Sequence, residues 1–185
     1  VKMPLPELLG DAWAKAQRGT IKPDRATPSA EIVAGPASAS GPHTTHFSVV
    51  DAAGDAVALT TTINFWYGSG VTVKGGGFVL NNEMDDFAAV PGTANGYGLV
   101  QGEANAIAPG KRMLSSMAPT IVTGPDGKVV LVAGAAGGPT IITSVFQEMS
   151  AVVDFGLDVG AAVSAPRFHM QHLPDEVAFE KAGLA

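Results

Sequence analysis

Two adjacent threonines, Thr44 and Thr45, open an alternating β-branched run directly after a stretch rich in Pro, Ser, Ala and Gly. A threonine hydroxyl is a weak nucleophile unless a base lies beside it, and an N-terminal threonine can use its own α-amine as that base. A cut between His43 and Thr44 would free such an amine, and the flexible stretch before it could accommodate a strained bond. Thr44 is therefore a candidate nucleophile, with an ordinary strand residue as the alternative.

A glycine pair, Gly137 and Gly138, lies between a predicted strand and a predicted helix in AGAAGGPTIITSV. A turn of small residues at such a place points backbone N–H groups at one spot, where they can bind an oxyanion or a phosphate beside the helix N-terminus. The lack of a Gly-Lys-Ser/Thr sequence excludes a Walker phosphate loop. A tight turn that only permits close packing is the alternative.

Carboxylates gather in LNNEMDDFA, where Glu83, Asp85 and Asp86 follow two asparagines. They could hold an ammonium group or a hard cation, but the spacing of a calcium loop is missing, and a solvated turn is the alternative. Ser115 and Ser116 follow two basic residues in KRMLSSMAP and are compatible with binding a substrate carboxylate, although serine pairs are also common in loops.

The four histidines show no Ser-His-Asp spacing, and HMQH is more typical of packing than of a metal site. We therefore predict no metal site. The chain has 185 residues, 46% hydrophobic, with a net charge of −6 and scattered basic residues, so we expect no nucleic-acid partner and no membrane partner. The absence of cysteine excludes disulfides, thiolate metal sites and a Cys nucleophile, and it leaves the compartment open.

Hydrophobic periodicity predicts the elements that must position these residues. Alternating runs on either side of AAGD predict an antiparallel hairpin over residues 44–64. Apolar residues at helical spacing over residues 139–156 predict a buried helix that ends at a glycine. The remaining predictions are helices at 4–19 and 158–165, strands at 77–82, 120–124 and 128–136, and a loop at 21–42. Strands followed by packed helices indicate an α+β layered domain.

Over residues 27–180 the chain resembles the γ-glutamyltranspeptidases, members of the N-terminal nucleophile hydrolases. Six motifs carry the resemblance, in order and at compatible spacing: TTHFSVVD, TTTIN, LNNEMDDF, KRMLSSMAPT, GGPTIITSV and APRFHMQHLPDE. The resemblance implies an αββα sandwich, with antiparallel sheets between helices, that is incomplete in this chain. It also implies two regions: residues 1–43 as the tail of a large-subunit-like region with a linker, and residues 44–185 as a small-subunit-like catalytic domain that stops before the family's C-terminal strands.

The same resemblance implies a role for each motif residue. The precursor would cut itself before Thr44, which becomes the nucleophile, while Thr62 would hydrogen-bond and help to activate it. Gly137 and Gly138 would form the oxyanion hole. The groups that hold the substrate would be Asn64, Glu83 and Asp86 for its amino and carboxylate ends, Ser115 and Ser116 for its carboxylate, and Tyr97 as the gate in the lid PGTANGYG.

The implied reaction is γ-glutamyl transfer or hydrolysis of glutathione and related γ-glutamyl amides through a γ-glutamyl-threonine ester, resolved by water or an acceptor amine, without a metal or organic cofactor. The expected partner is a large-subunit segment, which in the family supplies an arginine with no counterpart found in this sequence. Bacterial members of the family are often periplasmic or secreted.

Two alternatives stay open at this point. A cephalosporin (glutaryl) acylase of the same superfamily shares most of these motifs but accepts a substrate side chain without an α-amino group. The carboxylates Glu83 and Asp86 suit an ammonium group and therefore favour the first interpretation. The other alternative is an uncleaved, inactive remnant that forms homo-oligomers through exposed core surface.

Overall fold

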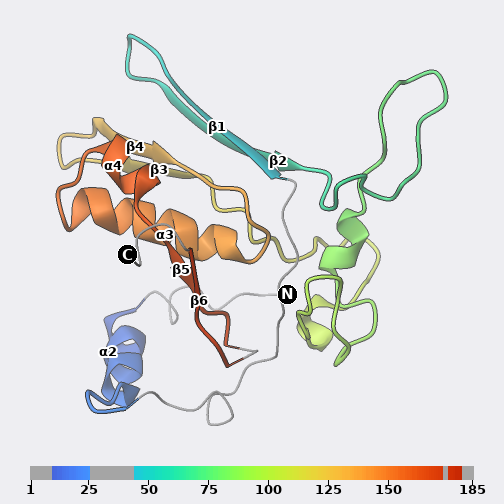
Figure 1. The fold of residues 1–185 in the computed structure, drawn as a ribbon, viewed down its shortest axis with the longest axis horizontal. Coiled ribbons are helices and arrows are strands. Elements are labelled where there is room, and N and C mark those ends of the chain that lie inside the picture. Colours follow the sequence, from blue (N-terminus) through green and yellow to red (C-terminus); the bar gives the residue numbers. More distant parts are fainter. Residues whose placement is uncertain (1–9, 26–43, 173–174, 181–185) are drawn as a thin grey trace.

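The structure, a computed structural model, describes residues 10–25, 44–172 and 175–180. Figure 1 shows its elements, and their order confirms the predicted α+β class. The helices are α2 Asp11–Thr20, α3 Thr140–Val153 and α4 Val159–Ser164, with 3-10 turns η2 Glu83–Asp86 and η3 Glu103–Asn105. The strands are β1 Thr44–Val50, β2 Ala56–Thr62, β3 Thr120–Thr123, β4 Val129–Ala133, β5 Phe168–His169 and β6 Ala178–Phe179.

Part of the predicted organisation lies outside the described residues. Most of the predicted loop at 21–42 and the first part of the predicted helix at 4–19 fall there, whereas α2 accounts for the rest of that helix. The predicted boundary between residues 43 and 44 falls at the edge of a described range, so the division into two regions stays a prediction.

The first hairpin forms as predicted, with β1 and β2 antiparallel and Thr44 directly opposite Thr62. Its turn is closed by Asp51, whose Oδ1 accepts hydrogen bonds from the backbone N–H of Ala53 at 2.8 Å and of Asp55 at 3.0 Å. Because strand side chains alternate between the two faces, Thr44, His46 and their cross-strand partners share one face of the hairpin.

The second hairpin, β3–β4, is also antiparallel and carries a register shift between Val122 and Thr123. The two hairpins form adjacent layers, and α3 packs against β4 on the other side (Figure 1). Ser48 Oγ of β1 donates to the carbonyl of Val132 on β4 at 3.3 Å. The His46 ring lies against Gly134, where a Cβ atom would be 2.1 Å from Nδ1. These contacts hold the start of β1 at a fixed distance from the end of β4.

Helix α3 confirms the predicted helix, and one of its faces forms part of the core. Ile141, Val145 and Glu148 are buried. Ile142 and Phe146 are 56% and 62% exposed, so the helix predicted to be buried is buried on one face among the described residues. The helix is apolar on two sides, and the described elements cover only one of them. Helix α4, also predicted, packs against α3 and is capped by Asp158, whose Oδ1 accepts from the N–H of Ala161 at 3.0 Å.

The strand predicted at residues 77–82 does not form in the structure. In that segment Val79 forms only an isolated bridge with Thr72. Gly75 and Gly77 adopt positive φ angles of 78° and 72°, which turn the chain before a ladder can extend. The segment projects from the molecule at the upper right of Figure 1, and Phe78 is 57% exposed.

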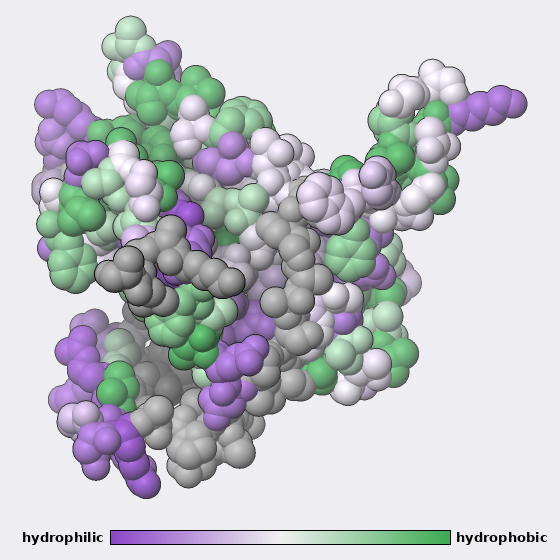
Figure 2. All heavy atoms as spheres, in the orientation of Figure 1, coloured by the Kyte–Doolittle hydropathy of each residue, from purple (hydrophilic) through white to green (hydrophobic). Residues whose placement is uncertain are grey.

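The described surface is unusually apolar in two places. Figure 2 shows hydrophobic side chains along the β1–β2 hairpin and on the projecting segment. On the hairpin these are the outward-facing residues Phe47, Val49, Val57 and Leu59. None of the helices in the described part of the chain has the length and apolar character that a membrane span requires.

Candidate active site

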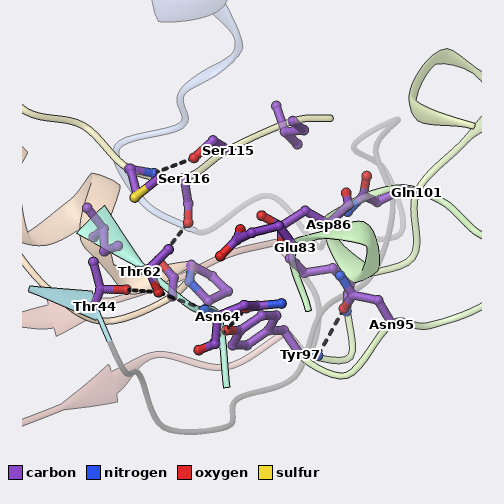
Figure 3. Close-up of a pocket in the computed structure, with 16 residues that line it drawn as sticks. Thr44, Thr62, Asn64, Glu83, Asp86, Asn95, Tyr97, Gln101, Ser115 and Ser116 are labelled. Atoms are coloured by element: carbon purple, nitrogen blue, oxygen red, sulfur yellow. Dashed lines mark hydrogen bonds between the residues drawn. The ribbon is translucent and has the colours of Figure 1, made fainter. Parts of the chain in front are cut away.

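One pocket collects the predicted site residues from the hairpins, the long loops and the start of α3 (Figure 3). All of them except Gly137 line it, and they are Thr44, Thr62, Asn64, Glu83, Asp86, Tyr97, Ser115, Ser116 and Gly138. The structure therefore brings together residues that are up to 94 positions apart, from 44 to 138, although it assigns no role to any of them.

The other lining residues were not predicted from the sequence. Two are polar, Asn95 and Gln101, and the rest are the mostly apolar Leu99, Leu114, Met117, Pro139 and Ile141. A signal for Asn95 was present, because asparagine in a glycine-containing loop commonly bonds to the backbone two residues ahead. Its Oδ1 accepts from the N–H of Tyr97 at 2.9 Å and of Leu99 at 3.0 Å.

Thr44 and Thr62, the threonine pair of the pocket, lie opposite each other at the open end of the first hairpin. Thr44 Oγ1 donates to Thr62 Oγ1 at 3.3 Å, and the same oxygen accepts from the N–H of Asn64 at 2.9 Å. The bond directs the Thr44 proton toward Thr62, and the proposed role of Thr44 as nucleophile stays a prediction. The predicted cut before Thr44 lies at the edge of the described residues and stays a prediction.

Asn64 is held in a conformation that few residues adopt. Its φ is 70°, and it is only 4% exposed. Asparagine tolerates this left-handed region better than other residues that carry a Cβ atom. Its Nδ2 donates to the carbonyl of Asn82 at 3.3 Å, and its Oδ1 accepts a hydrogen bond from the hydroxyl of Tyr97. Asn64 thus joins the hairpin to two loops.

Tyr97 lies across one side of the pocket (Figure 3). Its ring centroid is 5.3 Å from that of Phe65, and its Cε1 lies 3.0 Å from the position that a Cβ on Gly138 would take. Burial, followed by the charges of Asp86 and its acidic neighbours, raises the pKa of Tyr97 to about 12. The phenol therefore stays protonated and donates its hydrogen bond across the neutral pH range.

The acidic turn η2 supplies the charge of the pocket. Burial, together with the adjacent Asp86, raises the pKa of Glu83 to about 7. Burial also raises the pKa of Asp86. Glu83 Oε1 is buried and has no hydrogen-bond partner among the described residues. An unpaired carboxylate oxygen of this kind is suited to a cationic ligand.

The serine pair lies opposite these carboxylates (Figure 3). Ser116 Oγ donates to the carbonyl of Gly138 at 2.9 Å, and Ser115 Oγ accepts from the N–H of Met117 at 3.2 Å. Neither of the two basic residues before the pair lines the pocket, and Lys111 Nζ instead donates to the carbonyl of Ala106 at 2.7 Å.

The glycine turn leads from β4 into α3. Gly137 and Gly138 have φ angles of 153° and 53°, and a Cβ at Gly137 would lie 2.1 Å from Thr140 Oγ1, so the turn requires glycine. Within the described part of the chain the N–H of Gly138 has no hydrogen-bond acceptor. A donor that is unpaired beside the start of a helix can stabilise a developing oxyanion. Over the described ranges no group of three or more metal-ligating side chains occurs.

Known proteins are similar to this chain in both sequence and fold. A family model described as Gamma-glutamyltranspeptidase matches residues 1–185. The chain is 50% identical over 182 residues to the glutathione hydrolase proenzyme of Pseudomonas aeruginosa, an overlap of 98% of this chain and 32% of that protein. The values for the glutathione hydrolase proenzyme of Escherichia coli are 50% over 182 residues, 98% and 31%. The chain thus spans about a third of the length of these curated relatives.

Two solved structures agree with this result. A crystal structure of a threonine-to-alanine mutant of Helicobacter pylori gamma-glutamyltranspeptidase matches with a TM-score of 0.73 and 57% identity, over 76% of this chain and 75% of that one. The enzyme of Pseudomonas nitroreducens complexed with L-DON matches with a TM-score of 0.70 and 56% identity, over 73% and 70% of the two chains.

Proposed function

The chain belongs to the gamma-glutamyltranspeptidase family, and from this premise we propose that it forms the catalytic segment of an enzyme that hydrolyses or transfers the γ-glutamyl group of glutathione and related amides. The observation that carries the proposal is the pocket, in which a threonine pair, an acidic turn, a serine pair and Gly138 face one another. The name of the bacterial relatives, glutathione hydrolase proenzyme, supports both the donor and formation from a precursor.

The two ends of a γ-glutamyl group fit opposite sides of this pocket. The α-ammonium would pair with Glu83 and Asp86, which would give the buried Glu83 Oε1 a partner that it lacks among the described residues. The α-carboxylate would accept a hydrogen bond from Ser115, and one from Ser116 once its hydroxyl turns from the carbonyl of Gly138, to which it donates in the structure. The described lining residues include no lysine or arginine. We therefore place the cation that would neutralise this carboxylate on a large-subunit segment outside the described residues.

The chemistry would proceed in two steps. Thr44 Oγ1 attacks the γ-carbonyl carbon, its proton passes to the α-amine of the same residue, and the N–H of Gly138 stabilises the oxyanion. The tetrahedral intermediate then collapses and breaks the amide C–N bond. The leaving amine takes the proton from the α-amine of Thr44, and a γ-glutamyl ester remains on Thr44. Water or an acceptor amine then attacks the ester carbonyl and restores the hydroxyl. Thr62, which accepts the hydrogen bond of Thr44, would hold the nucleophile in place.

The glutaryl acylase alternative fits the pocket less well. A glutaryl group has no α-ammonium, so it would bury the Glu83 and Asp86 carboxylates without a cationic partner. Burying an unpaired carboxylate is costly. The acidic turn therefore favours the γ-glutamyl donor.

A release assay with a chromogenic γ-glutamyl anilide, on the complete protein as its gene encodes it, tests the proposal. We expect Thr44→Ala to lose the signal. Thr45→Ala is the matched control, because Thr45 is exposed and faces away from Thr44, and it should keep the signal. Full activity in Thr44→Ala would refute the proposed nucleophile. An inactive wild type that forms oligomers in light scattering would support the inactive remnant instead.

The processing step has a separate test. Mass spectrometry of the wild-type protein should find a fragment that begins at Thr44, and Thr44→Ala should remain one chain. Cleavage of the variant at the same bond would show that the hydroxyl of Thr44 does not drive it.

A further inference from the structure

Asn105 lies directly behind the pocket wall and contacts three of the residues that line it. Its Nδ2 donates to the carbonyl of Asp86 at 2.6 Å and to Oε1 of Gln101. Its Oδ1 accepts from the N–H of Leu114 at 3.0 Å. Asn105 itself is half-buried and does not line the pocket. One side chain thus connects the acidic turn, Gln101 shortly after the lid segment, and the segment that leads to the serine pair.

The backbone of the same residue is anchored as well. The carbonyl of Asn105 accepts from the N–H of Ala88 at 3.0 Å, and its own N–H donates to the carbonyl of Gly102 at 3.0 Å. A carboxamide is needed for the side-chain pattern, because it offers two donors on nitrogen and an acceptor on oxygen. A carboxylate has no donor, and a hydroxyl has only one. Asn105 is therefore a fixed point to which both sides of the pocket are tied.

We propose that Asn105 is a positioning residue that sets the spacing between the carboxylates of Glu83 and Asp86 and the serine pair. This inference rests on the proposed function. In a γ-glutamyl group the α-ammonium and the α-carboxylate are attached to one carbon atom, so the groups that bind them must keep a constant separation. Asp86 is held through its carbonyl and the serine pair through Leu114.

A positioning role and a general structural role of Asn105 predict different changes in ligand affinity. Loss of Asn105 should weaken a ligand that contacts both sides of the pocket much more than a ligand that contacts one. L-Glutamate, a product of the proposed hydrolysis, presents both charged groups. Glutarate is the same five-carbon diacid without the α-ammonium. A residue that only supports the fold would change the affinity of both ligands alike.

Two variants remove the bonds in different ways. Asn105→Asp keeps an acceptor for Leu114 but turns an oxygen toward the carbonyl of Asp86, and Asn105→Ala removes all three bonds. Ala104→Asp is the matched control, because it adds the same charge at an exposed position of the same turn, η3.

Calorimetry on the complete protein measures the affinity for each ligand. We expect both Asn105 variants to bind L-glutamate about tenfold or more weakly and glutarate within about twofold, as loss of one or more net hydrogen bonds predicts. Ala104→Asp should bind both ligands as the wild type does.

Three results would overturn the inference alone: unchanged L-glutamate affinity in the Asn105 variants, equal losses for the two ligands, or failure of both variants to fold, which would assign Asn105 to the fold. A wild type that neither binds L-glutamate nor hydrolyses the anilide would instead overturn the proposed function.

Discussion

The hydroxyl of Tyr97 donates a hydrogen bond to Oδ1 of Asn64, 33 residues earlier in the chain. It links the lid segment to the residue that also donates its N–H to Thr62. Asn64 and Tyr97 are 4% and 6% exposed, so water cannot easily replace the bond. This bond therefore helps to hold one side of the pocket, together with the ring contact between Tyr97 and Phe65.

Tyr97→Phe should lower the free energy of unfolding by about 1–3 kcal/mol, because it leaves a buried carbonyl oxygen without its donor. The ring contact with Phe65 would remain. Urea unfolding measures the change. Tyr67→Phe is the matched control, because Tyr67 is 76% exposed, and it should leave the midpoint unchanged. Equal midpoints for wild type and Tyr97→Phe would show that the bond contributes nothing to stability.

Glu83 should make the stability of the unliganded protein depend on pH. Its pKa is raised from 4.5 to about 7 by burial and by Asp86, so the folded chain holds this proton more tightly than the unfolded chain does. The resulting stabilisation is complete below the unfolded value of 4.5 and is lost as the pH rises through about 7. Glu83→Gln should remove this part of the pH profile in urea unfolding. An unaltered profile would contradict the assignment.

The same carboxylate should give ligand binding the opposite dependence on pH. The α-ammonium of L-glutamate requires ionised carboxylates, so its affinity should increase as the pH rises through about 7. Calorimetry between pH 5.5 and pH 8.5 can follow this, since that window spans roughly 1.5 units on either side of the midpoint. Glu83→Gln should flatten the increase, whereas Glu103→Gln, at an exposed position, should not.

Arg167 should be important for the packing of the C-terminal elements. Its Nη1 donates to Glu148 Oε1 at 3.3 Å and to the carbonyl of Val163 at 3.1 Å, and its Nε donates to Glu180 Oε1 at 3.2 Å. Burial raises the pKa of Glu148, and Arg167 opposes that effect. Arg167→Leu should therefore lower the free energy of unfolding by about 3 kcal/mol at neutral pH, because the buried carboxylate loses its partner.

The loss in Arg167→Leu should shrink as the pH falls and Glu148 becomes protonated. Adding Glu148→Gln should restore much of the stability, because the unpaired charge is then gone. Lys128→Leu is the control, because it breaks an ion pair whose side chains are 84% and 57% exposed, and little change is expected. A similar effect in both single variants would argue against the burial mechanism.

Gly134→Ala should disturb the contact between the hairpin layers. The new Cβ would lie 2.1 Å from His46 Nδ1, while the ring is held by Thr60 Oγ1 at 2.8 Å, so we expect a loss of about 1–3 kcal/mol from overpacking. His46→Ala should make room for it, so the double variant should lose less stability than the sum of the two single changes. Gly102→Ala, with no atom within 4 Å of the new Cβ, should be neutral. Additive losses would show that the ring does not restrict this position.

The first hairpin and the helices were predictable from local signals. A period of two on both sides of a short turn fixes a hairpin and its register, and the register alone places Thr44 opposite Thr62. Apolar residues at helical spacing predicted α3, and the helix predicted at 158–165 begins at Asp158, which caps α4 in the structure. The strand predicted at 77–82 did not form because its antiparallel pairing with residues 71–73 extends over a single bridge, Thr72–Val79, on either side of the turn at Gly75 and Gly77.

The candidate site was predictable only as a set of residue types in motif order. Three features could not be predicted from the sequence. Glu83 Oε1 is buried without a partner among the described residues, Tyr97 contacts Asn64, and Asn105 bonds to opposite sides of the pocket. Periodicity and turn chemistry act over a few residues and therefore fix local elements. Burial, pKa shifts and contacts across the pocket depend on which distant segments pack together, and only the tertiary structure decides that.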